Sequence, residues 1–352
     1  MDNLLPAVIE LDIRRNKLLF KGNTSSWLSQ KTAYDLNTHY TNGLSKYVEK
    51  IRFEVISDIS ECEKIWNYFS PKETLFDLWE FRMFFHEVYG RRPYFLTIKK
   101  NDKMLACLPL AYEEAEKAYA WFGSSWQEDC RFFAVDPFYV PILLFFSPKP
   151  LHLYGICSED KGKLPEFINT KEEEGNYFLN LETKTSINDY FIFLNKKKRY
   201  NLKRDYKYIK SFGPVMIEDE FEHYDKMVQI TNQRFHKRGL ETDFDTDPYM
   251  ERIFKNIVSK SKKDFKVKML RAEIEGKIAG IDIIAEYNNL YYPLRGGNDT
   301  TNFPGIGNFL NIYEITEAIE KNMKEINFLQ YDYGWKGSCL QKRPRFKYLA
   351  KE

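Results

Sequence analysis

The sequence has few of the residues that build metal centres and disulfide frameworks. Its 352 residues include only five cysteines and five histidines. The cysteines are odd in number and widely spaced, no C-x-x-C occurs, and the histidines never stand at a metal-ligand spacing. The sequence therefore predicts reduced cysteines packed in the core, no bound metal, and a protein of the cytoplasm.

A long apolar run is missing as well. The most apolar stretch, 140–146, is interrupted by Pro141, whereas a membrane-spanning helix needs about 20 apolar residues. We expect a buried strand there, within 138–146. The N-terminal segment reaches Glu10 before any apolar run long enough for a signal peptide, so neither a transmembrane segment nor an export signal is expected.

No charge of one sign dominates the chain. It has 53 basic and 51 acidic residues, for a net charge of +2, which argues against a general nucleic-acid coat protein. What the sequence has in quantity is aromatic: 28 Phe and 24 Tyr, within a hydrophobic share of 43%. This composition excludes a wholly disordered chain, and the length suits two domains at about 150 residues each.

The first part of the chain is read as an arm followed by alternating helices and strands. Residues 1–50 are irregular in pattern, and we interpret them as an accessory arm. A strand is expected at 51–56, and Ser60-x-x-Glu63 resembles a capping box that begins a helix. A hairpin turning at Asn101-Asp102 follows a second helix. Further strands are expected at 119–122, 151–156 and 177–181, with a charged connector at 171–175.

The second part repeats this order. The segment 103–110 can be laid over 277–284, which lies 174 residues later and follows the turn Glu275-Gly276. Because helix, helix and hairpin recur in the same order, we predict two related α/β domains at 51–182 and 183–352. Each would be a mixed sheet flanked by helices.

A basic helix is predicted at the junction of the two domains, over 187–211. It begins near Ser186 and is stopped by Gly213-Pro214. Eight basic residues lie within 196–210 against a single acid, Asp205. This segment therefore has a net charge of +7, which exceeds the net charge of +2 of the whole chain.

The same helix carries a resemblance to a known family. Leu194-x-x-Lys197-Lys198-Arg199-x-Asn201-Leu202-Lys203-Arg204 is similar to a helix of the BioF2-like branch of GNAT acyltransferases, relatives of the Fem peptidyltransferases. The C-terminal part follows the same family order. Its elements are Leu290-Tyr291-Tyr292, Asn298-Asp299, Pro304-Gly305 before a helix, Tyr331-Asp332-x-Gly334 and a late Lys342. The resemblance covers about 51–352.

The resemblance implies two GNAT-like halves and an acyltransferase. The donor would be acyl-CoA and the acceptor an amine or hydroxyl, often in cell-envelope or polysaccharide chemistry. Two alternatives stay open: an aminoacyl-tRNA-dependent peptidyltransferase of the Fem kind, which uses tRNA and can act on a lipid-linked precursor, and a catalytically degenerate GNAT-like pair that only binds a ligand. The sequence leaves the acceptor and the oligomeric state undetermined.

A phosphate of the donor is expected at the start of the helix after residue 304. Gly305, Ile306, Gly307 and Asn308 would hold it, because a helix N-terminus presents unpaired N–H groups and glycines allow close approach. The GNAT pattern R/Q-x-x-G-x-G/A is met in its glycines, but Asn302 stands at its first, basic position. The alternative is a simple strand-to-helix turn.

The basic helix is the second candidate for phosphate binding. Arg199, Lys203 and Arg204 are predicted to contact phosphates of CoA, tRNA or a lipid-linked acceptor. The alternative is a solvated helix face.

Acid–base chemistry is assigned to carboxylates. Asp282 lies in an otherwise apolar strand, which predicts a raised pKa, with Glu286 on the same face. Asp332 and Lys336 are the other catalytic candidates. Arg295 and Lys342 are expected to hold a carboxylate or an oxyanion. The alternative for the C-terminal group is a structural salt-bridge cluster that closes the sheet.

Overall fold

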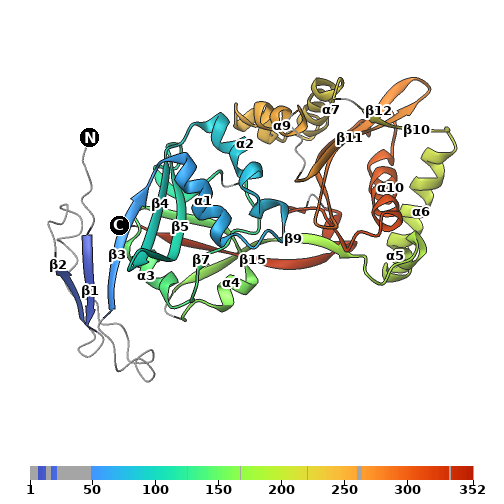
Figure 1. The fold of residues 1–352 in the computed structure, drawn as a ribbon. Coiled ribbons are helices and arrows are strands. Elements are labelled where there is room, and N and C mark those ends of the chain that lie inside the picture. Colours follow the sequence, from blue (N-terminus) through green and yellow to red (C-terminus); the bar gives the residue numbers. More distant parts are fainter. Residues whose placement is uncertain are drawn as a thin grey trace. The chain divides into compact units, whose positions relative to one another are not determined.

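The computed structural model describes residues 7–12, 17–21, 49–124, 126–166, 168–219, 221–259, 264–332 and 334–351 (Figure 1). They form two compact units. Unit 1 holds the described residues up to Pro71, Gly90–Lys171 and the segment from Phe346 onward; unit 2 holds Lys72–Tyr89 and Glu172–Arg345. The predicted boundary at 182/183 stays a prediction. Most of the predicted arm, 1–50, lies outside the described residues.

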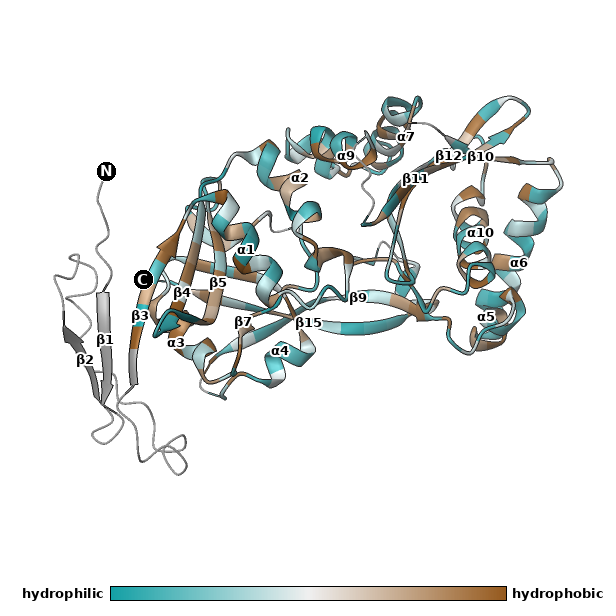
Figure 2. Ribbon diagram, in the orientation of Figure 1, coloured by the Kyte–Doolittle hydropathy of each residue, from teal (hydrophilic) through white to brown (hydrophobic). Residues whose placement is uncertain are grey.

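Unit 1 is built on a mainly antiparallel sheet. Its strands are β1 (Ala7–Asp12), β2 (Lys17–Lys21), β3 (Glu49–Ile56), β4 (Pro93–Lys100), β5 (Lys103–Glu113), β6 (Ala118–Trp121), β7 (Phe133–Ala134) and β8 (Leu151–Cys157), and its helices are α1 (Ile59–Phe69), α3 (Tyr139–Phe146) and α4 (Ser158–Gly162). The strand order is β8-β6-β5-β4-β3-β1-β2, with β7 beside β5 and a parallel contact between β6 and β8. β4 and β5 are largely brown in Figure 2, since they form the apolar core with α3.

Unit 2 is a mixed sheet with helices on both faces. Its strands are β9 (Thr170–Asn180), β10 (Val215–Asp219), β11 (Lys266–Ile274), β12 (Lys277–Tyr287), β13 (Leu290–Asn298), β14 (Glu325–Asn327) and β15 (Gln341–Ala350, which ends in unit 1). Its helices are α2 (Trp79–Tyr89), α5 (Ile187–Phe193), α6 (Lys196–Lys210), α7 (Tyr224–His236), α8 (Asp243–Thr246), α9 (Met250–Ser259) and α10 (Ile306–Glu320), with 3-10 turns η2 (Leu75–Asp77) and η3 (Lys336–Ser338). The strand order is β10-β11-β12-β13-β14-β9-β15.

The contacts of two glycines identify which helices cover the two faces of this sheet. A Cβ added to Gly280 of β12 would lie 2.6 Å from Leu310 of α10, and one added to Gly297 of β13 would lie 2.5 Å from the Met227 carbonyl of α7. One face therefore carries α10, with α6 packed beside it, and the other carries α7 (Figure 1). The mixed α/β architecture and the hairpin turns at Asn101-Asp102 and Glu275-Gly276 confirm the sequence predictions.

Three local predictions are wrong. Residues 139–146 form helix α3 and not a strand; Pro141 lies in its first turn, where a helix needs no N–H donor. The segment 171–175 is the start of β9 and not a connector. The N-cap of α1 is Asp58, whose carboxylate accepts hydrogen bonds from the N–H groups of Ser60 and Glu61, so Ser60-x-x-Glu63 is not the capping box.

The basic helix predicted over 187–211 is two helices. Its start is correct, because Ser186 and Asp189 form a capping box at α5. The chain is extended at Leu194 and Asn195, and Asn195 then caps α6 by accepting from the N–H of Lys198.

Candidate active site

The parallel pair β13–β14, joined through α10, is the place in unit 2 where the sheet opens. The two strands are paired only at Leu290↔Glu325 and Tyr291↔Ile326, although β13 continues to Asn298. Ligands of open α/β sheets bind outside the carboxyl ends of parallel strands, beside the helix that connects them. The side chains near this end of β13 are therefore the first candidates for chemistry.

Two carboxyl groups meet there in the interior. Asp282 of β12 faces α10 and is hydrogen-bonded to Glu314 of that helix. Asp282 is 7% exposed and Glu314 only 1%. Gly296 lies opposite Asp282 in the register, and a Cβ there would lie 1.7 Å from Asp282 Oδ1. Glycine is required at 296 because the carboxylate occupies the space of a side chain.

Burial raises the pKa values of both carboxyl groups, but to different extents. Burial raises the pKa of Asp282 to about 6, against the lowering effects of the Glu314 hydrogen bond and the Arg234 charge. Burial raises the pKa of Glu314 well above its ordinary value, and the charge of Asp282 adds to this. Since two like charges cannot share a buried site, Glu314 is the protonated donor and Asp282 the acceptor. The raised pKa predicted for Asp282 is confirmed.

Asn298, the last residue of β13, adds an amide to this region. A Cβ atom added to Gly307 would lie 3.6 Å from Asn298 Nδ2. A Cβ atom added to Gly280 would lie 2.9 Å from Asn298 Oδ1. Within the described part of the chain, this buried Oδ1 has no hydrogen-bond partner. Asn298 thus lies between β12, the strand that contains Asp282, and the first turn of α10.

The predicted phosphate loop forms the start of α10, as the sequence indicated, but an acid already lies there. Gly305 is the N-cap, with a φ of 94°, which favours glycine. Asp205 of α6 lies against it: a Cβ on Gly305 would be 3.0 Å from Asp205 Cβ. Asn308 Nδ2 donates to Asp205 Oδ2 at 2.7 Å. A carboxylate of the chain itself thus occupies the region where a phosphate was expected. Binding of a donor by Gly305, Ile306, Gly307 and Asn308 stays a prediction.

The three predicted phosphate-binding residues of α6 differ in their contacts and in their exposure. Arg204 donates through Nε and Nη2 to Asp205 Oδ1, at 2.9 and 2.7 Å. Lys203 lies over the Phe191 ring, 4.7 Å from its centroid. Arg199 is half-buried, whereas Lys203 and Arg204 are exposed. Their role in phosphate binding stays a prediction.

Asp332 and Lys336 lie in a closed loop. The Asp332 carboxylate accepts hydrogen bonds from the N–H groups of residues 334, 335, 336 and 337. Burial alone would raise the pKa of Asp332, but these four bonds outweigh it and hold the pKa below its ordinary value. Lys336 Nζ donates to the backbone carbonyls of Phe328 and Gln330. Both side chains thus bind backbone groups of their own loop, and their catalytic role stays a prediction.

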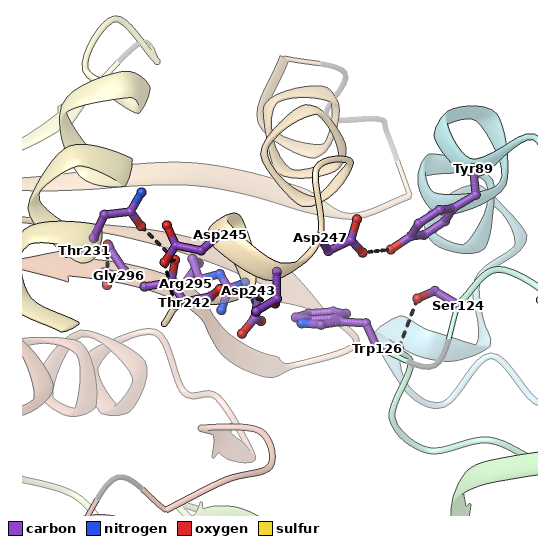
Figure 3. A network of polar contacts seen from close by, with 12 residues as sticks. Tyr89, Ser124, Trp126, Thr231, Thr242, Asp243, Asp245, Asp247, Arg295 and Gly296 are labelled. Carbon is purple, nitrogen blue, oxygen red and sulfur yellow. Dashed lines mark hydrogen bonds and ion pairs between the residues drawn. The ribbon is translucent and has the colours of Figure 1, made fainter. Parts of the chain in front are cut away.

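Lys342 and Arg295 are also placed away from the carboxyl pair. Lys342 Nζ lies 3.7 Å from Glu174 Oε1, at the pairing of β9 and β15. Arg295 points to the α7 face, where its Nη2 donates to Asp243 Oδ2 at 2.7 Å (Figure 3). The ring centroids of Phe244 and Phe254 lie 4.8 and 5.0 Å from the guanidinium carbon of Arg295. The structure therefore does not bring the predicted catalytic residues Asp282, Asp332 and Lys336 into one cluster.

Sequence reasoning missed Glu314 and Asp205. Glu314 stands four residues after Leu310, inside the buried stripe of α10, and a carboxylate in such a stripe was the available signal. Glu286, which was expected on the face of Asp282, is ion-paired with Lys321 at the other end of α10. Nothing local marks Asp205, because its partner is a hundred residues away.

The described ranges contain neither a membrane-spanning helix nor a cluster of metal ligands. No helix there is long and apolar enough to cross a bilayer. No three His, Cys, Asp or Glu side chains gather there as metal ligands would.

Known proteins can now be compared with this fold. Residues 196–337, less than half of the chain, match the family described as acetyltransferase (GNAT) domain. No curated protein matches the sequence. A crystal structure of FemX superposes with a TM-score of 0.57 at 10% identity, covering 85% of this chain and 97% of FemX.

Two further structures have the same arrangement. L-PGS from Bacillus licheniformis gives a TM-score of 0.53 at 13% identity, covering 84% of this chain and 93% of L-PGS. A tandem GNAT protein from the clavulanic acid biosynthesis pathway gives 0.50 at 7% identity, covering 85% and 98%. At these identities the similarity establishes the fold. The chain has a tandem GNAT-like fold that is similar to the fold of FemX.

Proposed function

We propose that this protein is an acyltransferase that moves an acyl group from acyl-CoA to an amine or hydroxyl, with Asp282 as the proton acceptor. The observation that carries the proposal is the buried Asp282–Glu314 pair beside the open end of β13 and β14. The GNAT match over 196–337 supports transferase chemistry, because it contains both carboxyls and the whole of α10.

The carboxyl pair suits the proton that the acceptor must lose. The acceptor attacks the thioester carbonyl, the new C–N or C–O bond forms, and the C–S bond breaks. Asp282 takes the proton from the attacking atom and, once protonated, gives it to the departing thiolate, which leaves as the free CoA thiol. A base with a pKa near 6 is ionised at neutral pH and still basic enough to assist. Glu314 keeps its own proton and fixes the Asp282 carboxylate by hydrogen bonding.

Asn298 is the proposed oxyanion partner. Its Nδ2 is a neutral donor next to the first turn of α10, and donors of this kind stabilise the charge that develops on a carbonyl oxygen. Asp332, Lys336, Lys342 and Arg295 have the structural contacts described above and no step in this scheme.

A specific observation favours a second donor, aminoacyl-tRNA. The Asp205 carboxylate at Gly305 repels a pyrophosphate, while α6 concentrates eight basic residues on one helix. For the acceptor we propose the class that the resemblance implies, which is a glycan- or lipid-linked molecule of the cell envelope. We propose that the reaction takes place in the cytoplasm.

Calorimetry with CoA separates the two donors. If the pyrophosphate binds at Gly305 and Gly307, Asp205→Asn removes a like charge and should tighten CoA binding about two- to fivefold, the usual effect of one charge at a helix N-terminus. Asn at 205 has one acceptor oxygen, which can accept from Asn308, while the two bonds from Arg204 are lost. The matched control is Asp225→Asn, which removes a carboxylate from the first turn of α7 and should leave CoA binding unchanged.

Native mass spectrometry of the purified protein completes the test. Retained CoA species agree with the first donor. Retained aminoacyl-tRNA, with no CoA response in either variant, selects the second. If wild type and Asp205→Asn retain neither ligand, the transferase proposal fails and the degenerate binding protein is the better description.

A further inference from the structure

Large apolar side chains are exposed along one segment of unit 2. Within residues 192–212, which we name the basic–apolar segment, the exposed fractions are 71% for Ile192, 53% for Phe193, 67% for Tyr200, 49% for Tyr208 and 42% for Phe212. The segment comprises the end of α5, all of α6 and the turn after it. Side chains of this size are usually covered when they gather in one place.

The same segment carries a stripe of positive charge. Lys196, Tyr200, Lys203 and Lys207 are spaced by four, three and four residues, so they share one side of α6, and all four are exposed. Leu202 and Ile209 lie on the opposite side and are buried. Figure 2 shows α6 as mainly teal, in agreement with its many basic residues. The outward side of α6 therefore combines ammonium groups with an aromatic ring.

The chemistry of these side chains selects among anionic partners. Phosphodiester backbones are recognised best by free arginine forks, but the Arg204 guanidinium already donates twice to Asp205. Six of the eight basic residues of α6 are lysines, which act as point charges toward a diffuse negative surface. Ile192 offers neither a stacking ring nor a hydrogen bond, so a nucleic acid gives it no favourable contact, whereas the apolar part of a lipid interface does. Charged lipid headgroups above acyl chains supply both partners.

We propose that the basic–apolar segment docks this protein on the surface of an anionic membrane, with its lysines toward lipid phosphates and Ile192 and Phe193 in the interface. The protein would lie on the bilayer and not span it. The inference does not depend on the catalytic scheme, but it competes with the aminoacyl-tRNA donor for the same lysines of α6, and the experiments below therefore include tRNA.

Vesicle co-sedimentation of the full chain tests the proposal. Wild type should bind vesicles of phosphatidylglycerol and phosphatidylcholine in equal amounts, bind pure phosphatidylcholine weakly, and be released by salt. Each lysine near such a surface changes the affinity about fivefold. Lys196→Gln with Lys207→Gln should therefore weaken binding about twentyfold. The control, Lys103→Gln with Lys277→Gln, removes the same charge at exposed hairpin positions and should bind like wild type.

A second pair of variants separates lipid from nucleic acid. Phe193→Ser should weaken vesicle binding about tenfold, since it removes apolar area from the interface, whereas Leu240→Ser, at another exposed apolar residue, should not. All of these changes are at exposed positions, and unchanged thermal melting confirms that each variant is folded. Binding of Phe193→Ser like wild type would overturn the proposal. So would tighter binding of mixed tRNA than of vesicles at the same salt, because the surface would then be a nucleic-acid site.

Discussion

The β4–β5 hairpin of unit 1 and the β11–β12 hairpin of unit 2 are built to one plan. β5 and β12 both have 11 residues, and each begins and ends 174 positions from its counterpart. The ladders are irregular at the same relative place, between Ile98 and Lys99 and between Ala272 and Glu273. Agreement in length, register and bulge supports the internal repeat that the sequence predicts.

The elements after each hairpin also correspond. In unit 1 the order is β6, α3 and β8, and in unit 2 it is β13, α10 and β14, with β7 as an addition in unit 1. In both, the strand before the helix runs parallel to the strand after it. Each half therefore has the same crossover at the same place in its sheet.

The interiors differ at one corresponding position. Leu108 of β5 stands where β12 has Asp282, and it is fully buried in an apolar cluster with Leu143 and Leu144 of α3. In unit 2 the helix that follows provides Glu314 instead. The first repeat is filled by hydrocarbon at this position and the second holds a carboxyl pair, so the two repeats keep the same backbone arrangement with different interiors.

The largest expected effect comes from removing the ionisable group from the second copy. Asp282→Asn keeps the size of the side chain and an oxygen that accepts from Glu314, but it has no basic carboxylate. We expect the turnover of acyl transfer, followed as release of free CoA thiol with an amine acceptor, to fall about 10²- to 10⁴-fold.

Stability and donor affinity provide the control for that variant. Because the geometry of the pair is kept, thermal melting and CoA affinity should change little. Turnover equal to wild type would contradict the role of Asp282 as proton acceptor and would leave the carboxyl pair as a structural feature.

The converse change places a carboxyl in the first copy. Leu108→Asp introduces an acid into a site surrounded by Leu, Ile and Val side chains, and it should lower the free energy of unfolding by about 4 kcal/mol or more. Urea unfolding measures this. Leu108→Met, which keeps the volume, should cost less than about 1.5 kcal/mol. A loss below 1 kcal/mol for Leu108→Asp would show that unit 1 also accommodates a carboxyl group.

Periodicity and turn chemistry made part of this comparison visible in the sequence. The alternating pattern and the turn residues Asn101-Asp102 and Gly276 located both hairpins, because Asn, Asp and Gly suit backbone with positive φ. Glu275 also has a positive φ, of 51°, which its residue type does not favour. Asp282 stood out as a single charge in an apolar strand. The sequence predicts a strand where helix α3 lies, because a short and wholly apolar run has no period that distinguishes a helix from a strand.

The contacts that define the site could not be found in the same way. Asp205 meets Gly305 across a hundred residues of chain, and Glu314 meets Asp282 only when α10 lies on the sheet. Arg295 and Asp282 are near in the ladder but face opposite sides, because a β-strand alternates. Tertiary packing, and not local pattern, decides which of the candidate residues come together.

The smallest expected effect concerns pH, and it separates two neighbouring acids of α10. In the folded protein the pKa of Glu314 is raised by burial and by Asp282, so the folded state binds a proton that the unfolded chain releases above its ordinary pKa of about 4.3. The free energy of unfolding must then decrease as pH rises above that value, by about 1.4 kcal/mol per pH unit for one proton. Glu314→Gln should flatten this decrease and match wild type near pH 4.

Glu317 provides the control of opposite sign: burial would raise its pKa, but the bonds from Lys268 and Tyr291 lower it. Its contribution is present above the ordinary pKa and is lost as pH falls. Glu317→Gln should therefore destabilise the protein at neutral pH and lose that effect in acid. Urea unfolding across a pH series measures both slopes, and parallel curves for the two variants would contradict the assignment of the proton to Glu314.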